Sequence, residues 1–567
     1  MLIQRFTKAA FLVKFKIMVE TKRCKTCGTA YDVTDEDRSY YDRLGVPPST
    51  KCPVCRWKHL LAFCVYGRFR ITKSALSGKT IITTFPESVK FPIYDYKEFL
   101  SDVWDPLSYG QDYDPQRPFF DQFAALQAKV PHPHQSAMRN VNCDWCDDVW
   151  DSKNCYLSRS MGNCENVLYG YRIVNVKDSV DVTYSFDMQQ SYDCTYCFNG
   201  FKVRHALSCR DAVDSAFIYD CRNVQNCFMC WNLRNKKYCI RNRQYSKEGY
   251  AEKLKEYNLG SWKTVQLLRQ EWDGILREQA VHRQDLNFKT TDSSGNFLND
   301  CKDCKNCYQW EQSEHCYNGL RGLLNKNAID VTGVWQAEMV GNFANSTGGY
   351  LMKYSSWTHH CRYSEYLDQC VDCEYCFGCV GLKKKRYCIL NKQYSKDEYE
   401  KLRELIVDSM KKAGVYGDFF PYQLSTFGYN LTLGNIYFPE TKESALKKGM
   451  LWDDSDSVRA EGMSTADLPD DIKAVPDSLT TQPLVCPETS LRFNISPREL
   501  AFYRQMNIPL SRIHQDARTL KRFSWMKVLD TYSYQCVFCK KEVQAYYPPE
   551  FGYQKIACVD CYQKNVA

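Results

Sequence analysis

The chain has 567 residues, including 31 cysteines and 40 tyrosines, and a formal net charge of +8. This length exceeds what one hydrophobic core usually holds, so we expect about three or four domains. No stretch approaches the roughly 18 to 20 consecutive apolar residues that cross a bilayer, which predicts a soluble, cytoplasmic protein with no membrane partner.

Residues 1–20 are predicted to be an N-terminal extension. Lys8, Lys14 and Lys16 interrupt its apolar residues and no small-residue cleavage site follows, so we do not expect a signal peptide. Met18 is an alternative start.

In a reducing compartment thiols stay free, so C-x-x-C pairs are expected to bind metal and not to form disulfides.

Residues 21–100 are predicted to form an N-terminal zinc-knuckle module. Cys24-x2-Cys27 and Cys52-x2-Cys55 are separated by 24 residues. Each pair can present two thiolates from a tight turn to one tetrahedral ion. We expect structural zinc, with iron as the main competitor. Between the pairs, residues 36–44 have a helix-like pattern.

The centre of the chain contains a duplication. Residues 221–247 match residues 370–396 at a constant offset of 149, with 14 of 27 positions identical. We predict a first cysteine- and tyrosine-rich repeat copy over residues 101–260, and a helical connector with the second copy over residues 261–415. Each copy is expected to close on a helix, with Ser246 or Ser395 as N-cap and Gly414 ending the second helix.

A smaller motif recurs in the first copy: Asn or Asp, then Cys or another small residue, then an aromatic. Its occurrences begin at Asn154, Asn166, Asp178, Asp193, Asp214 and Asn226, with spacings of 12, 12, 15, 21 and 12 residues. Strand-like units of this size cannot bury a face alone and are typical of stacked solenoid coils. The predicted fold is mixed and β-rich. It has a duplicated solenoid, interpreted as a right-handed parallel β-helix, with helical inserts and two flanking zinc-knuckle modules of treble-clef-like type.

Twenty-one cysteines lie between Cys143 and Cys388, and two interpretations compete. Runs such as Cys301-x2-Cys304-x2-Cys307 resemble iron–sulfur ligation. However, Val224 replaces Cys373 in the duplicate copy, and a valine cannot ligate a metal. We favour a buried ladder of small side chains, because free cysteine packs as a small hydrophobe.

Residues 416–452 are predicted to be a connector. The acidic residues 453–482 are expected to form either a poorly packed linker or a strap on the surface. Residues 483–567 are predicted to form a C-terminal zinc-knuckle module, in which Cys536-x2-Cys539 and Cys558-x2-Cys561 have zinc-ribbon spacing. Two structural Zn²⁺ ions are therefore expected per chain.

The two terminal modules are similar to each other. Subtracting 462 from the residue numbers of the C-terminal module aligns Cys486 with Cys24. At the positions of the other three ligands, Cys27, Cys52 and Cys55, the C-terminal module has Thr489, His514 and Ala517. In the following segment, an offset of 463 places the C-terminal zinc cysteines over Lys73, Leu76, Asp95 and Glu98. We interpret each module as two knuckles, of which one has kept its metal.

Basic residues cluster at the same place in both repeat copies and are interleaved with tyrosines. The clusters are Arg234, Lys236, Lys237, Arg241 and Arg243, and then Lys383, Lys384, Lys385 and Arg386; the tyrosines are Tyr238, Tyr245, Tyr387 and Tyr394. Cations neutralise phosphates and exposed aromatics stack on bases, which predicts a nucleic-acid surface. The alternative is a solvated basic face with its tyrosines packed in the core.

Several motifs together resemble a family of cysteine-rich zinc-ribbon proteins from candidate-phylum bacteria whose function is not established. They are YYDRLGVPP, SDVWDPLSYGQDYD, PFFDQF, the KYCIRNRQYSKEGY and RYCILNKQYSKDEY duplicates, GDFFPYQLSTFGYN and YFPETKESALKKG. The resemblance covers nearly the whole chain. It implies no particular activity and no catalytic residues.

Motifs of common enzymes are missing from the sequence: there is no phosphate-binding glycine-rich loop, G-x-S-x-G elbow or H-E-x-x-H. The pair His359-His360 is the best candidate for acid–base or metal chemistry, although packing is the commoner role of such a pair. We expect a non-enzymatic, zinc-stabilised binding scaffold whose ligand is RNA, DNA or a ribonucleoprotein assembly such as the ribosome. The alternatives are a protein–protein scaffold and a β-helix hydrolase or lyase.

Overall fold

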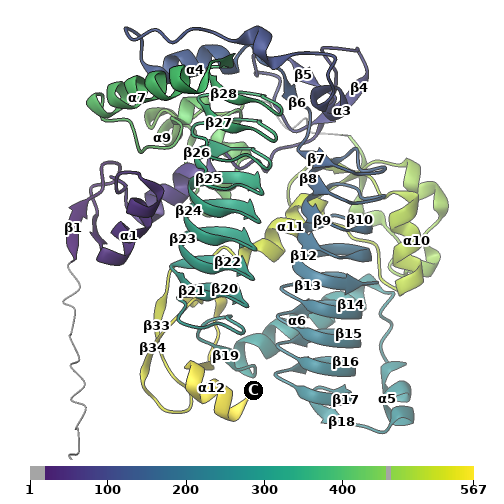
Figure 1. The fold of residues 1–567 in the computed structure, drawn as a ribbon. Coiled ribbons are helices and arrows are strands. Elements are labelled where there is room, and N and C mark those ends of the chain that lie inside the picture. Colours follow the sequence, from purple (N-terminus) through teal and green to yellow (C-terminus); the bar gives the residue numbers. More distant parts are fainter. Residues whose placement is uncertain (1–18, 455–460) are drawn as a thin grey trace, which may run out of the picture.

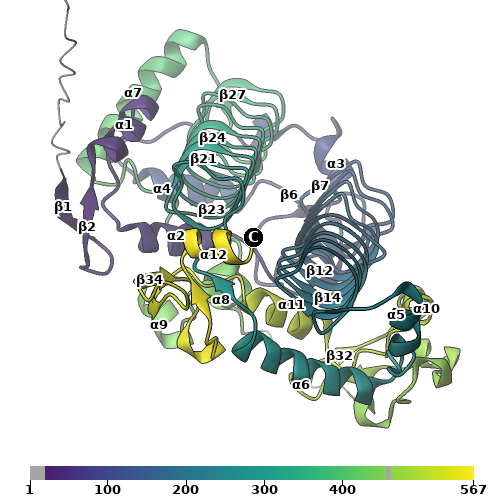
Figure 2. The ribbon, with the colours of Figure 1, turned by 90° about the horizontal axis from the view of Figure 1, so that it is seen from below.

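The computed structural model describes residues 19–454 and 461–567 (Figure 1). The predicted extension over residues 1–20 therefore lies almost entirely outside the described residues, as does part of the acidic segment. Two β-solenoids stand side by side and run in opposite directions (Figure 1). Viewed from below, they are two separate stacks of rings surrounded by helices and hairpins (Figure 2). The predicted β-rich fold with a duplicated solenoid is confirmed.

Strands of the two solenoids pair in parallel, except for a final antiparallel strand that closes each one. The first solenoid contains β7 (Ala137–Met138), β8 (Cys146–Trp150), β9 (Ser158–Gly162), β10 (Glu165–Leu168), β11 (Tyr171–Val174), β12 (Lys177–Gln189), β13 (Tyr192–Thr195), β14 (Phe198–Leu207), β15 (Arg210–Tyr219), β16 (Arg222–Trp231), β17 (Arg234–Ile240) and β18 (Arg243–Gln244). The second contains β20 (Gly295–Asn299), β21 (Lys302–Lys305), β22 (Cys307–Glu311), β23 (Glu314–Leu323), β24 (Lys326–Trp335), β25 (Glu338–Thr347), β26 (Lys353–Ser356), β27 (Glu374–Phe377), β28 (Arg386–Ile389) and β29 (Lys392–Gln393).

One turn of each solenoid is twelve residues long, because paired residues on neighbouring parallel strands are twelve positions apart, as Phe198 and Arg210 are, or Lys326 and Glu338. Within a turn, residues at intervals of three have left-handed backbone. Asn154, Leu157 and Ser160, for example, have φ angles of 54°, 46° and 53°. Asn and Asp tolerate this conformation better than other non-glycine residues, which explains the recurring Asn and Asp of the short motif.

Asparagine side chains also link successive turns. Asn142 donates to Asn154 at 3.0 Å, Asn154 to Asn166 at 3.2 Å, and Asn166 to Asp178 at 2.8 Å. The irregular spacings in the sequence therefore arise from a strict twelve-residue turn with a three-residue subunit. The spacings of 15 and 21 residues are also multiples of three, because the motif recurs at different bends of the turn.

Every third side chain points into the solenoid, so four side chains fill each turn. The core of the first solenoid is made almost entirely of Cys, Val, Ala, Ile and Met, and that of the second of the same types with Leu, Trp310 and Phe343. Serine occupies the same columns: Ser215 and Cys227 are one turn apart and both are buried. The Ser215 hydroxyl donates to the Val213 carbonyl at 2.8 Å and accepts the Cys227 N–H at 3.0 Å.

Cysteine thiols in these columns make the same kind of contact. The Cys209 thiol lies 3.4 Å from the carbonyl oxygens of both Leu207 and Ile218. All central cysteines are free and buried. Among the described residues, no three of them bring ligand atoms together as a metal site requires. The structure therefore supports the buried ladder over a metal cluster.

Each terminal module contains two hairpins that are followed by helices. The N-terminal module has β1 (Glu20–Arg23), β2 (Ala30–Val33), α1 (Asp35–Leu44), α2 (Pro53–Leu61), β3 (Arg70–Lys73), β4 (Thr80–Thr83), β5 (Ile93–Tyr94) and α3 (Tyr96–Leu100). The C-terminal module has β31 (Leu484–Val485), β32 (Arg492–Phe493), α10 (Pro497–Met506), α11 (Gln515–Ser524), β33 (Tyr532–Gln535), β34 (Glu542–Ala545), β35 (Ile556–Ala557) and α12 (Val559–Asn565). An offset of 462 relates the two modules through their second hairpins, and an offset of 463 relates the segments after them, β5 with β35 and α3 with α12.

Other helices connect or cover the solenoids: α4 (Phe119–Gln127), α5 (Lys247–Leu254), α6 (Trp262–Glu278), α7 (Lys396–Lys412), α8 (Leu433–Tyr437) and α9 (Lys442–Lys447). Ser246 and Ser395 cap α5 and α7. After residue 461, three short 3-10 turns bury Leu468, Ile472 and Leu479 against α10. In the described part of the chain, no helix is both long and apolar enough to cross a membrane.

Each terminal module packs on the solenoid of the opposite half of the chain. In the N-terminal module, Arg56 pairs with Asp330 of the second solenoid at 2.6 Å, and both side chains are buried. In the C-terminal module, Arg518 pairs with Asp181 of the first solenoid at 2.8 Å. The two arginines are 462 residues apart and the two aspartates 149 apart, so one docking contact occurs twice.

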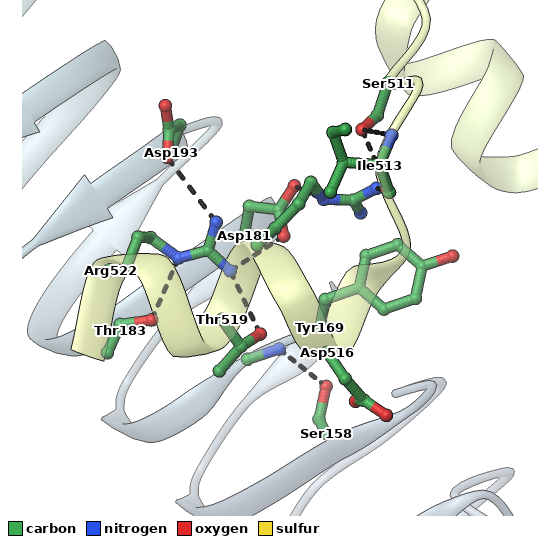
Figure 3. A network of polar contacts seen from close by, with 12 residues as sticks. Ser158, Tyr169, Asp181, Thr183, Asp193, Ser511, Ile513, Asp516, Thr519 and Arg522 are labelled. Carbon is green, nitrogen blue, oxygen red and sulfur yellow. Dashed lines mark hydrogen bonds and ion pairs between the residues drawn. The ribbon is translucent and has the colours of Figure 1, made fainter. Parts of the chain in front are cut away.

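Arg522 extends the second docking contact (Figure 3). Its guanidinium lies 2.8 Å from Asp181, 3.0 Å from Thr183 and 3.4 Å from Asp193. Helix α11 is thereby held across the strands of the first solenoid (Figure 3). Buried ion pairs of this kind fix orientation, because an unpaired partner would leave a charge without compensation.

The ladder predicts how the central cysteines respond to substitution. Cys227→Ser should lower the free energy of unfolding by no more than about 1 kcal/mol, because serine already forms the matching hydrogen bonds one turn earlier. Cys227→Leu should cost about 1 to 3 kcal/mol by overfilling the column. Urea denaturation followed by circular dichroism measures both. A serine variant less stable than the leucine variant would contradict the ladder.

Candidate metal centres and basic clusters

The first cysteine tetrad joins a hairpin to the start of a helix. Cys24 and Cys27 lie in the turn between β1 and β2, whereas Cys52 caps α2 and Cys55 lies in its first turn. The four sulfur atoms all lie within 4.8 Å of one another. Burial raises the pKa of the Cys24 thiol, but the N–H groups of Cys52, Cys27 and Thr26 outweigh it and bring the pKa to about 6. These N–H groups favour the thiolate, which is the form that binds metal.

The second tetrad repeats this geometry in the C-terminal module. Cys536 and Cys539 follow β33, Cys558 caps α12, and Cys561 lies within that helix. The four sulfur atoms again lie within 4.8 Å of one another. The pKa of Cys536 is raised by burial but brought to about 6 by the N–H groups of Cys539, Cys558 and Phe538. All eight predicted ligands are thus brought together in two groups of four.

Two further knuckles have the same backbone but lack the cysteine set. The N–H of the residue at the Cys24 position donates to the carbonyl five residues later in all four hairpins: Cys24 to Thr29, Ser74 to Lys79, Cys486 to Leu491 and Cys536 to Lys541, at 2.8 to 2.9 Å. In the C-terminal copy, Cys486 stands with Thr489, His514 and Ala517, as the sequence indicated. The hairpin fold therefore survives the loss of its metal ligands.

The other metal-free knuckle shows how the ion has been replaced. Its hairpin positions are Ser74 and Ser77, and not the neighbouring Lys73 and Leu76 to which the offset of 463 pointed. For this hairpin the offset is 462, because the N–H bond to Lys79 places Ser74 where Cys536 stands. The offset of 463 is correct for the helix that follows, because Asp95 caps α3 as Cys558 caps α12. Ser74 donates to Glu98, and Lys79 lies 2.8 Å from Asp95. Hydroxyls, carboxylates and one ammonium group here take the place of four thiolates around a cation.

Four thiolates form a closed tetrahedral set with no position left for a substrate. The tetrads can therefore hold an ion that ties a hairpin to a helix. This geometry suits a structural ion in both terminal modules.

The basic clusters lie at opposite ends of the molecule, because the solenoids run in opposite directions and each cluster is on the last turns of one (Figure 1). Several of their cations are engaged within the chain. Arg234 pairs with Asp220 at 3.0 Å, Arg241 with Glu271 at 2.6 Å, and Arg386 with Glu374 at 3.0 Å. Lys383 donates to the Ser101 carbonyl and lies over the Trp104 ring.

The remaining cations of the two clusters face solvent to differing degrees. Lys236, Lys237, Arg243 and Lys384 are exposed and Lys385 is half-buried. The four tyrosines interleaved with the clusters, Tyr238, Tyr245, Tyr387 and Tyr394, are partly buried against the hydrophobic cores. For these four, the geometry matches the alternative of packed rings beneath a solvated basic face.

Exposed tyrosines instead lie on the second solenoid, next to its basic cluster. Tyr363 and Tyr375 are 39% and 36% exposed. Their rings are 4.8 Å apart and nearly parallel, and Tyr375 stacks on Tyr387 at 5.4 Å. The signal for this ladder is the twelve-residue spacing of the three tyrosines. It becomes visible only once the length of the turn is known.

The first histidine of the pair lies in the interior of the protein. His359 is buried with its ring centre 4.7 Å from that of Trp150. Burial and the neighbouring His360 lower its pKa to about 3, so the imidazole stays neutral. His359 therefore acts as a packing residue.

No protein-family model matches the chain, and no curated protein matches it. The assignment of its chemistry therefore rests on the geometry of the tetrads and of the surfaces described above.

The four knuckles predict a specific pattern of metal content. Purified protein should contain about two zinc ions per chain, and Cys24→Ser or Cys558→Ser should each remove one, because three remaining ligands bind more weakly. Cys486→Ser is the matched control: it changes the same position of a knuckle that lacks the other cysteines, so metal content should not change. Elemental analysis measures the metal. Iron with acid-labile sulfide, or loss of metal from the Cys486 variant, would contradict the assignment.

Proposed function

We propose that this protein is a zinc-stabilised, non-enzymatic binding scaffold and that its ligand is nucleic acid. The observation that carries the proposal is the stacked, exposed pair Tyr363 and Tyr375 on the second solenoid, next to the turn that carries the exposed Lys384 and the half-buried Lys385. Aromatic rings and unpaired cations on one surface are the two components with which proteins hold single-stranded RNA or DNA.

The ladder and the cations are fixed by the same turns of the solenoid. Tyr363, Tyr375 and Tyr387 occupy one column, and Lys384 and Lys385 precede Tyr387 within its turn. Successive turns of a β-structure are about 4.8 Å apart, so this surface offers regularly spaced contacts along its axis. Such a surface suits an extended strand better than a compact ligand.

Zinc supports this surface indirectly in the proposal. The tetrads hold α2 and α12 against their hairpins, and α2 carries Arg56, which docks on the second solenoid. Removal of the first ion would loosen the N-terminal module without touching the tyrosine ladder. Zinc is therefore assigned a structural role, and the solenoid surface is assigned the binding role.

The proposal predicts a salt-dependent affinity for single-stranded RNA. Lys384→Gln with Lys385→Gln should weaken binding and reduce the slope of log affinity against log salt by about 0.7 for each phosphate that is no longer neutralised. Tyr375→Ala should weaken binding by removing about 1 to 3 kcal/mol of stacking per base. Fluorescence anisotropy with a labelled oligonucleotide at several salt concentrations measures both effects.

Lys521→Gln with Lys527→Gln is the matched control, because these exposed lysines lie on and just after α11, away from the ladder, and their loss changes the net charge equally. Its affinity and slope should fall less than those of the Lys384 and Lys385 variant. Equal losses in both variants would show that only the net charge matters. No binding by the unmodified protein at low salt would remove the nucleic-acid proposal and leave a protein–protein scaffold as the better explanation.

A further inference from the structure

A cavity at the seam between the two solenoids contains more positive than negative charge. Arg210 and Arg222 of the first solenoid and Arg283 of β19 (His282–Arg283) line it, together with Asp220 and Asp285. Arg234 pairs with Asp220 at 3.0 Å, and Arg283 pairs with Asp285 at 3.3 Å. Asp220 also lies 3.7 Å from Arg222, so two arginines share this carboxylate. Four arginines therefore face two aspartates, an excess of two positive charges.

Arg210 is held in a position that leaves its N–H groups available. Its guanidinium carbon lies 3.9 Å from the ring centre of Phe198 and 4.0 Å from that of Phe288. A guanidinium stacked between two rings still donates hydrogen bonds in its own plane. One terminal nitrogen of Arg210 is buried without a hydrogen-bond partner, and within the described residues no carboxylate forms a salt bridge with this side chain. Burying an unsatisfied charged donor is costly, so its retention indicates a missing partner.

The surroundings of Arg222 also indicate an excess of positive charge in the cavity. Burial lowers the pKa of its guanidinium. Asp220 opposes this effect, and the positive charges of Arg234, Arg210 and Arg283 add to it. An anion in the cavity would relieve this repulsion.

The chain contains its own uncharged counterpart of this cavity. At the other end of the seam, the equivalent positions of the second solenoid are His359, Gln369 and Val371 in place of Arg210, Asp220 and Arg222. Strand β6 (His132–Pro133) corresponds to β19, and Pro133 and Gln135 stand in place of Arg283 and Asp285. His359 is neutral, so the counterpart holds none of these charges. The fold is therefore compatible with a neutral seam, and the arginines are not needed to close it.

We propose that the arginine-lined cavity binds a small dianionic oxyanion, either inorganic phosphate or the phosphoryl group of a phosphate ester. The excess of two positive charges matches a phosphate group, which carries about −1.5 to −2 at neutral pH. The planar donors of arginine fit phosphate oxygens well. The cavity has a volume of about 20 Å³, which exceeds the roughly 10 to 15 Å³ that one water needs, so side chains do not fill the space between these arginines.

Tyr562 of α12 closes one side of this site. It is 2% exposed, accepts a hydrogen bond from Arg234 at 2.8 Å, and donates to Asp220. The corresponding residue of the counterpart cavity is Phe99, which has no hydroxyl. The C-terminal module thus contributes a polar group to the charged cavity only.

Isothermal titration calorimetry of the full chain, in a buffer free of phosphate and at constant ionic strength, tests the site. Inorganic phosphate should bind saturably at one site per chain, and sodium chloride should not. Arg210→Gln should weaken phosphate binding at least about 10-fold, the usual loss for a charge-assisted hydrogen bond. Phenyl phosphate separates the two sources: binding of both compounds indicates a site open to esters, and binding of phosphate alone indicates the free ion.

A variant that binds phosphate more tightly provides a control, because a misfolded protein would not gain affinity. Asp285→Asn keeps the acceptor for the Asn287 N–H but removes a negative charge from the cavity, so it should tighten phosphate binding several-fold. Lys521→Gln with Lys527→Gln, outside the cavity, should leave the affinity unchanged. Absence of saturable binding of both phosphate and phenyl phosphate would overturn the proposal. So would equal affinity in the Arg210 variant or weaker binding in the Asp285 variant.

Discussion

The width of a twelve-residue solenoid turn is the constraint on which the rest of this structure depends. Four inward side chains share the interior of each turn, so only small residues fit in most columns, and the chain must bend at intervals of three residues. Cysteine, serine, valine and alanine meet this condition. The high cysteine content of the middle of the chain therefore follows from packing, and the Asn and Asp content follows from the left-handed bends.

Two solenoids of this kind expose long flat faces, and the rest of the chain fixes how those faces meet. Each terminal module docks on the solenoid of the other half through one buried arginine–aspartate pair, Arg56 with Asp330 and Arg518 with Asp181. Each half of the chain therefore holds the solenoid of the other half in place. The same duplication places two equivalent cavities at the two ends of the seam, and one of them has become strongly charged.

The tetrads and the duplications could be predicted from the sequence, because the spacing of residues along the chain identifies both. C-x-x-C pairs identify the tetrads, and the offsets of 149 and 462 identify both duplications. The hairpin at Ser74 was misplaced by one residue, since no cysteine remained there to fix the alignment, whereas Asp95 and Glu98 were placed correctly. The three-residue subunit was hidden because many residue types besides Asn and Asp, such as Leu157 and Arg172, occupy its left-handed positions. The charged cavity and the exposure of Tyr363 and Tyr375 depend on which columns of side chains face the other solenoid or the solvent. The sequence of a single chain does not show this.

The central claim is that two groups of cysteines have distinct roles: the eight in the terminal tetrads are placed to bind metal, and those of the solenoids fill space. Thiol labelling of the native protein, read by mass spectrometry with and without a chelator, tests it most directly. We expect no rapid labelling of solenoid cysteines in either condition, and labelling of the eight terminal ligands only after chelation. Solenoid cysteines that become reactive when metal is removed from the folded protein would contradict the account.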